Sequence, residues 1–314
     1  MGEKSLGQIH TVDFNLEIAE AATKGPSNAL LCDLSQSLSE QLQRNVRQGC
    51  YYKLVGIDAV IQAPEDPLLD GESGIVKGRF RYFLPTRGRC EAYRQAFKQM
   101  MEQMKGRGIN PRMNVQYDFR TVPRNLQNYT LNALTGNDLK NLATLDGQTV
   151  LALTANTATG TEVFDSYNEN IQDKNLGTPD FSSGLNTQIS TLITPTDFVL
   201  NEGNIYSGNE MIADTELEEI PFSIAYSYET KEDAAGKITS TFNSQQLNWR
   251  PDPALYIAIM CGQVEVVLDE IEADGDNPLL LDGVELDFSF HVAGWKSIMG
   301  NPDSKKSRSR KSKR

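Results

Sequence analysis

Period-two alternation of apolar and polar residues is the feature that most limits what this chain can fold into. Side chains of a strand point to opposite faces in turn, so such runs are typical of strands with one buried face. Four runs show it, at residues 12–18, 75–84, 113–122 and 284–295, and further short strand-like runs lie at 50–63, 148–155, 196–206, 221–229, 237–243 and 254–273. Turn-forming residues separate these runs, which predicts an all-β protein of the sandwich or jelly-roll type.

One helix interrupts the strand pattern. Apolar residues follow one helical face at Tyr93, Phe97, Met100, Met101 and Met104. Glycines at 106 and 108 then end the pattern, so we expect a helix over about 88–106, inserted between strands. The methionines are interpreted as core-filling side chains, because an unbranched thioether adapts to irregular gaps.

Residues 29–48 are ambiguous. Leu31, Leu34, Leu38 and Leu42 fit one helical face, whereas parts of the same run alternate as a strand would. We favour a helix here.

The composition indicates a soluble chain with enough apolar residues for a core. Hydrophobic residues make up 39% of the 314 positions, and the mean hydropathy is −0.43. The longest apolar runs, such as 254–261, are shorter than the roughly 20 residues that span a bilayer. The first residues lack the apolar segment of a signal peptide, so we expect no export by the secretory route. The four cysteines show no CxxC spacing and are expected to be free, buried thiols.

Motifs that carry catalysis are missing from the sequence. It contains no GxxxxGK[ST], GxGxxG, HExxH or GxSxG pattern, and its two histidines, His10 and His291, lie near opposite ends of the chain. We therefore predict a protein that is not an enzyme and holds no resident cofactor. A carboxylate-dependent hydrolase on a sandwich fold is the enzymatic alternative.

Charge is distributed very unevenly along the chain. The formal net charge is −12, yet residues 304–314 contain seven basic residues and no acid. Without them the chain holds 23 basic and 42 acidic residues, a net charge of −19. A segment without apolar residues cannot bury surface, so we predict a disordered basic tail that binds phosphates of lipid headgroups or nucleic acid. Its binding residues are Lys305, Lys306, Arg308, Arg310, Lys311, Lys313 and Arg314.

Two inner segments have opposite charge. Residues 77–124 contain twelve basic residues against three acids, whereas residues 264–287 contain nine acids and no base. Docking of one copy's basic surface on the acidic edge of the next is one interpretation, with Lys77, Arg79 and Arg81 as subunit-contact candidates. A solvated face is the other. The acidic stretch is interpreted as a solvated rim, with loosely bound Ca²⁺ as the alternative, because Pro278 and Leu279 break the spacing of an EF-hand loop.

The length favours two barrels. We expect a first jelly roll at 1–150, a second at 151–303 and the tail at 304–314, because a single barrel would need very long insertions. Two similar loop sequences, DPLLDG at 66–71 and NPLLLDG at 277–283, are a weak indication of related halves.

A β-rich body, one helix, a middle rich in Thr and Asn, and a basic arm together resemble viral capsid proteins. The double jelly-roll major capsid proteins of icosahedral, internal-membrane bacteriophages, some with single-stranded DNA, are similar in length. Capsid proteins of small circular single-stranded-DNA viruses, with one jelly roll, also fit, although their basic arm is usually N-terminal.

The double jelly-roll resemblance implies a homotrimer in an icosahedral virion shell, with host cytoplasm as the location before assembly. It implies penton and other minor capsid proteins as partners, and a tail that faces the inner membrane lipid or the genomic DNA. The non-structural alternative is a β-sandwich module that binds carbohydrate or a receptor. Exposed Trp249 and Trp295 would favour that module, because exposed indole rings stack on sugars.

Overall fold

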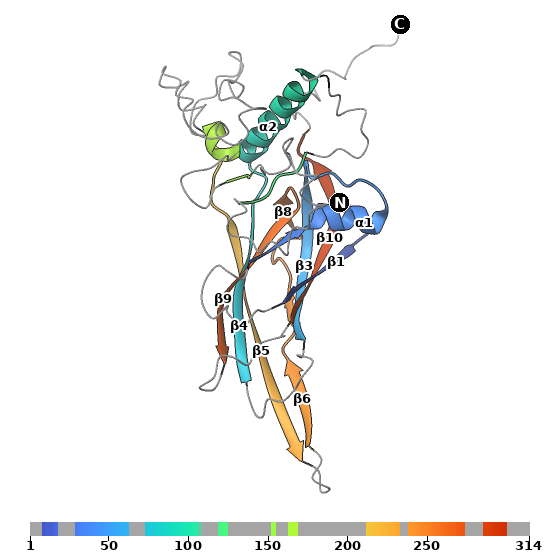
Figure 1. The fold of residues 1–314 in the computed structure, drawn as a ribbon, viewed down its shortest axis with the longest axis vertical. Helices are drawn as coiled ribbons and strands as arrows, with labels where there is room; N and C mark the ends of the chain where they lie inside the picture. Colours follow the sequence, from blue (N-terminus) through green and yellow to red (C-terminus); the bar gives the residue numbers. More distant parts are fainter. Residues whose placement is uncertain are drawn as a thin grey trace.

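The strands of this protein form two antiparallel sheets packed face to face (Figure 1). The computed structural model describes residues 8–17, 29–62, 73–106, 108, 119–124, 152–154, 163–168, 212–232, 238–273 and 285–299. Strands dominate these residues and helices are few, so the predicted all-β class is confirmed.

The first sheet is built on β3 (Cys50–Gln62), a strand of 13 residues. The order is β1 (His10–Glu17), β10 (Glu285–Ser297), β3 and β7 (Leu247–Trp249), and β8 (Ile257–Met260) also pairs with β3. All of these pairings are antiparallel.

The second sheet also has five strands. Its order is β2 (Ala29–Asp33), β9 (Gln263–Ala273), β4 (Ser73–Tyr82), β5 (Glu218–Glu232) and β6 (Ile238–Ser244). The expected run at 254–273 is thus two strands, because the chain turns at Cys261 and Gly262 between β8 and β9. Gly262 has a φ of 66°, and a Cβ there would lie 2.8 Å from the Tyr52 ring. Glycine is therefore needed at this turn.

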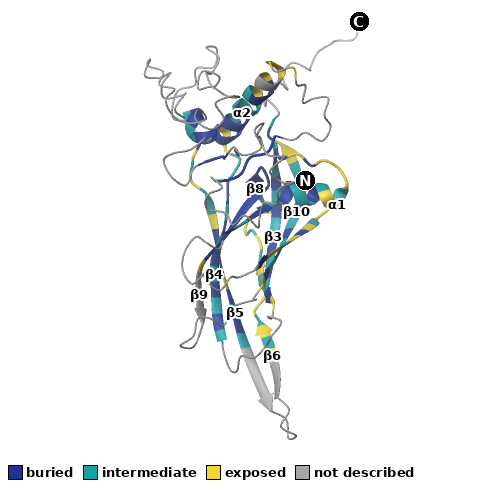
Figure 2. Ribbon diagram, in the orientation of Figure 1, coloured by how far each residue is buried: buried dark blue, intermediate teal, exposed yellow. Residues whose placement is uncertain are grey.

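The core between the sheets is aromatic. Phe80 of β4 lies 4.6 Å from Phe222 on its own sheet, and 5.5 Å and 5.9 Å from Phe288 and Phe290 on the opposite sheet, as ring centroids. Phe80 and Phe290 have no exposed surface, which follows from the period-two alternation along β4 and β10. Figure 2 shows this buried middle of the sandwich.

The ambiguous region 29–48 is both a strand and a helix. β2 ends at Asp33, and α1 (Leu34–Leu42) follows at once. The Asp33 side chain accepts hydrogen bonds from the backbone N–H groups of Ser35 and Gln36, which is an N-cap. Our preference for a helix from residue 29 was wrong, because the cap places the start of the helix five residues later.

The predicted second helix is confirmed as α2 (Arg87–Gly106). Ala92, Tyr93, Ala96 and Met100 lie on its buried face and belong to a second apolar cluster, which also includes residues of 119–168 and the β8–β9 turn. Figure 1 shows α2 at one end of the sandwich, opposite the end of the β5–β6 hairpin. The helix is therefore part of an insertion between β4 and β5 that packs on the end of the sandwich through a shared apolar cluster.

Strands on either side of residue 150 share both sheets. β10 lies between β1 and β3, and β9 lies between β2 and β4. The expected boundary between barrels at 1–150 and 151–303 does not match this pairing, because it would divide both sheets.

Other predictions fall on residues that the structure does not describe. These are the strand at 196–206, most of those at 113–122 and 148–155, the two similar loops and the tail at 304–314. Among the helices that are described, none is both long and apolar enough to cross a membrane.

Candidate subunit-contact surface

The three predicted contact residues lie on one face of the second sheet. Lys77, Arg79 and Arg81 alternate along β4 with Val76, Gly78 and Phe80, which are buried. The basic side chains therefore point away from the core, as the alternation predicted.

Carboxylates from both neighbouring strands neutralise Arg79. Its Nε and Nη2 atoms donate to Asp269 of β9 at 2.7 Å and 2.6 Å, and its Nη1 donates to Glu219 of β5 at 2.8 Å. Arg81 Nε donates to the other oxygen of Glu219 at 2.8 Å. A β-bulge opposite Lys77 and Gly78 inserts Asp269 as an extra residue, which places its carboxylate beside Arg79.

These four side chains, Arg79, Arg81, Glu219 and Asp269, form an ion-pair ladder across β9, β4 and β5, in which the pKa values of Glu219 and Arg79 are shifted. Burial raises the pKa of Glu219, but hydrogen bonds and charges from Arg79 and Arg81 outweigh it, and the net pKa is lowered. The hydrogen bonds that Arg79 donates to Asp269 and Glu219 raise its pKa. The side chains of Arg79 and Glu219 are about a third exposed, 35% and 36%, so each pair stabilises the fold by only about 0–1 kcal/mol.

We expect Glu219→Gln to destabilise the protein only where Glu219 is ionised. Its pKa is lowered in the folded state, so its contribution is present above pH 4.5, the ordinary pKa of a glutamate, and is lost as pH falls through the lower folded value. Urea unfolding of both proteins between pH 3 and pH 7 measures the difference. A difference that grows toward low pH would contradict this sign.

The ladder changes what Lys77, Arg79 and Arg81 can offer to a neighbouring subunit, which is the role predicted for them. Arg79 and Arg81 form ion pairs within their own chain, and Lys77 also takes part in an interaction. A neighbouring subunit would therefore contact arginines whose charges are already paired with Asp269 and Glu219, and not a row of unpaired basic side chains. The sequence did not predict this, because Asp269 and Glu219 are 190 and 140 positions away from Arg79.

A second polar cluster lies on the outer face of the first sheet. His291 Nε2 is 2.7 Å from Asp58 Oδ2, and His291 Nδ1 is 3.2 Å from Thr11 Oγ1. Arg250 Nη1 donates to the other oxygen of Asp58 at 2.6 Å. Burial raises the pKa of Asp58, but hydrogen bonds from Arg250 and His291 outweigh it and lower the pKa overall.

The hydroxyl, imidazole and carboxylate of this cluster have the order of a hydrolase triad. The setting differs from an active site, because Thr11 is an exposed residue on an open sheet face. Further hydrogen bonds between side chains of β1 and β10 lie beside it, since Asn15 donates to Asp287 and Ser289 donates to Asp13. We interpret the cluster as part of a polar cross-strand ladder that holds β1, β10 and β3 together.

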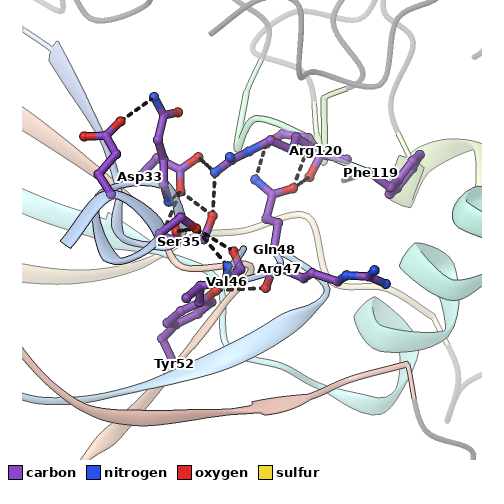
Figure 3. Close-up of polar contacts among 12 residues, drawn as sticks. Asp33, Ser35, Val46, Arg47, Gln48, Tyr52, Phe119 and Arg120 are labelled. Carbon is purple, nitrogen blue, oxygen red and sulfur yellow. Dashed lines mark hydrogen bonds and ion pairs between the residues drawn. The ribbon is translucent and has the colours of Figure 1, made fainter. Parts of the chain in front are cut away.

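A buried polar junction joins the insertion to the first strands (Figure 3). Arg120 donates to the Asp33 carboxylate and to the Ser35 hydroxyl, both at 2.6 Å. The Gln48 side-chain amide accepts from the backbone N–H of Thr121 at 2.6 Å and donates to its carbonyl at 2.8 Å. Local sequence patterns did not point to this junction, because its members come from separate segments.

Arg89 anchors the other attachment of the insertion. Its side chain is fully buried, and its guanidinium donates to Glu218 and to the backbone carbonyls of Leu84, Asp214 and Glu216. It therefore ties the chain entering the insertion to the chain leaving it.

The remaining candidate residues have structural surroundings. Trp249 and Trp295 are half-buried, and Trp295 stacks on Tyr52 at 6.1 Å with the Arg44 guanidinium 5.3 Å from its ring. All four cysteines are free and buried, as predicted. Within the described part of the chain, no group of three potential metal ligands is found. Residues 274–284 of the acidic stretch, for which loosely bound Ca²⁺ was the alternative interpretation, lie outside it.

Comparison with models of protein families, with curated proteins and with solved structures finds no match to this chain.

Proposed function

We propose that this chain is a self-assembling viral shell protein built on one jelly roll. The observation that carries the proposal is the nested strand pairing. β1 pairs with β10, β2 with β9, β3 with β7 and β8, and β4 with β5, while β10 also meets β3 and β9 also meets β4. A long hairpin rolled up in this way gives two Greek keys, the jelly-roll topology that capsid and lectin domains share.

A single barrel is compatible with a chain of 314 residues because a long insertion lies between β4 and β5. The chain between β4 and β5 covers residues 83–217, and its described part packs in a second apolar cluster at one end of the sandwich, together with Met260, Cys261 and Ile298. This arrangement favours the single jelly-roll capsid proteins over the double jelly-roll family. The proposal therefore keeps the capsid role and changes the number of barrels.

The role of the protein would be structural. Copies associate as a homotrimer and then as an icosahedral lattice, together with penton and minor capsid proteins, in the virion. The basic tail supplies seven positive charges for phosphates of the genome or of lipid headgroups. Production in the host cytoplasm precedes assembly.

The tail gives a test of this proposal. Deletion of residues 304–314 removes no apolar residue, so we expect unchanged thermal unfolding and weaker retention of single-stranded DNA and of anionic vesicles. Light scattering at low and moderate salt then compares the mass of both proteins. Trimers or particles of the full chain support the shell proposal, whereas a monomer at every salt concentration contradicts it.

A further inference from the structure

The outer face of the first sheet carries charges of opposite sign at its two ends. β10 lies between β1 and β3, and side chains of all three strands alternate between the core and this outer face (Figure 1). Asp13, Glu285 and Lys296 on the outer face are exposed in the folded chain. A partner can therefore reach both ends of the face.

Three carboxylates lie together at one end. Asn15 donates to Glu285 and to Asp287, both at 2.8 Å, and Ser289 donates to Asp13 at 2.6 Å. These donors are neutral, and none of the three carboxylates has a cationic partner among the described residues. This acidic end, formed by Asp13, Glu285 and Asp287, therefore keeps its negative charge.

Two lysines lie at the other end. Lys296 is exposed and lies opposite Tyr51 of β3, and Lys53 follows Tyr51 by two positions on the same face. Lys53 Nζ is 5.1 Å from the centre of the Tyr256 ring. Neither ammonium group has a carboxylate partner within the described ranges. This basic end, formed by Lys53 and Lys296, therefore keeps its positive charge.

The polar cluster between the two ends is paired within the chain. Asp58 accepts from Arg250 at 2.6 Å and lies 2.7 Å from His291. The outer face of the first sheet thus has an acidic end, a balanced middle and a basic end. The outer face of the second sheet differs, because its arginines are already paired with Asp269 and Glu219.

We propose that the outer face of the first sheet binds the same face of a second copy of this chain, with the two β10 strands antiparallel. A two-fold axis that lies between the faces and crosses β10 near His291, midway between Asp287 and Lys296, places the acidic end of each copy on the basic end of the other. Each copy has a net charge of −12, so two copies need a contact where unlike charges meet. This inference rests on the proposed self-assembly and assigns one of its contacts.

Charge reversal tests this contact in the full chain. Lys296→Glu sets a carboxylate against the acidic end twice in each dimer, so we expect association weaker by about tenfold or more in sedimentation velocity. Lys98→Glu, at an exposed position of α2, changes the net charge equally and is the control. Wild-type association of Lys296→Glu would overturn the inference and leave the shell proposal standing, whereas a wild-type chain that never associates would overturn both.

A charge exchange tests the register of the two copies. The double variant Lys296→Glu/Asp287→Lys keeps the net charge of −12 and restores unlike charges across the two-fold axis, so it should recover most of the lost association. The control Lys98→Glu/Asp287→Lys has the same net charge but sets two lysines against each other, so its association should stay weak. Equal association of the two double variants would contradict the proposed arrangement.

Carbodiimide cross-linking of the wild-type chain keeps the test decisive if a variant unfolds. This reagent joins a carboxylate to an amine that contacts it. Lys296 and Asp287 are nine positions apart on β10, roughly 30 Å, so a bond between them joins two copies. Mass spectrometry of the assembled protein should find Lys296 linked to Asp287 or to Glu285. Assembled protein in which Lys296 is linked to neither would overturn the inference.

Discussion

Arg89→Met lowers the free energy of unfolding by about 3–5 kcal/mol, because it removes a fully buried guanidinium that pairs with the half-buried Glu218 and donates to three backbone carbonyls. The guanidinium contacts Glu218 at 3.0 Å and the carbonyls of Asp214 and Glu216 at 2.8 Å and 2.5 Å. These acceptors lie on the segment that leads from the insertion into β5. The loss should therefore loosen the attachment of the insertion as well as the global fold.

Urea unfolding measures this loss, and hydrogen exchange of residues 212–218 reports the local effect. Arg89→Lys should restore only part of the stability, because an ammonium cannot reproduce the guanidinium fork. Lys98→Ala, at an exposed position of the same helix, is the matched control and should change little. A loss below 1 kcal/mol for Arg89→Met would contradict the anchoring role.

Phe80→Ala destabilises the sandwich by about 3–5 kcal/mol, as expected for removal of a fully buried ring. Phe80 has no exposed surface and contacts Phe288 and Phe290 of the opposite sheet. The substitution leaves a cavity between the two sheets, so both should become less stable together. Chemical denaturation with far-ultraviolet circular dichroism measures the effect.

Phe80→Leu is the companion variant for this position. It keeps an apolar side chain in the same place and should cost less, on the order of 1 kcal/mol. Equal losses for the alanine and leucine variants would indicate that the ring contacts are not what stabilises the core. A loss near zero for both would contradict the face-to-face packing of the sheets.

The predictions from sequence were accurate where a local pattern sets the structure. Strand-like runs placed strands at 50–63, 75–84 and 284–295, and the structure has them at Cys50–Gln62, Ser73–Tyr82 and Glu285–Ser297. The apolar stripe placed a helix at 88–106, and α2 covers Arg87–Gly106. Each of these patterns lies within one element, so it needs no knowledge of the partner strand.

Features that depend on distant partners could not be predicted. Strand order is set by pairings such as β1 with β10, which are almost the whole chain apart, and nothing local marks them. The same holds for the Arg79 ladder and for the Arg120 junction, whose carboxylate partner Asp33 is 87 positions away. The start of α1 was missed for a different reason, since the Asp33 cap is local but Leu31 fits both patterns.

Electron cryo-microscopy of the purified, concentrated chain at moderate salt tests the central claim most directly. The claim is that copies of this chain assemble into a shell with one jelly roll each. We predict closed particles of uniform diameter, with three upright barrels in each trimer. Trimers with six barrels would contradict the single-barrel assignment, and a uniform population of monomers would contradict the shell function itself.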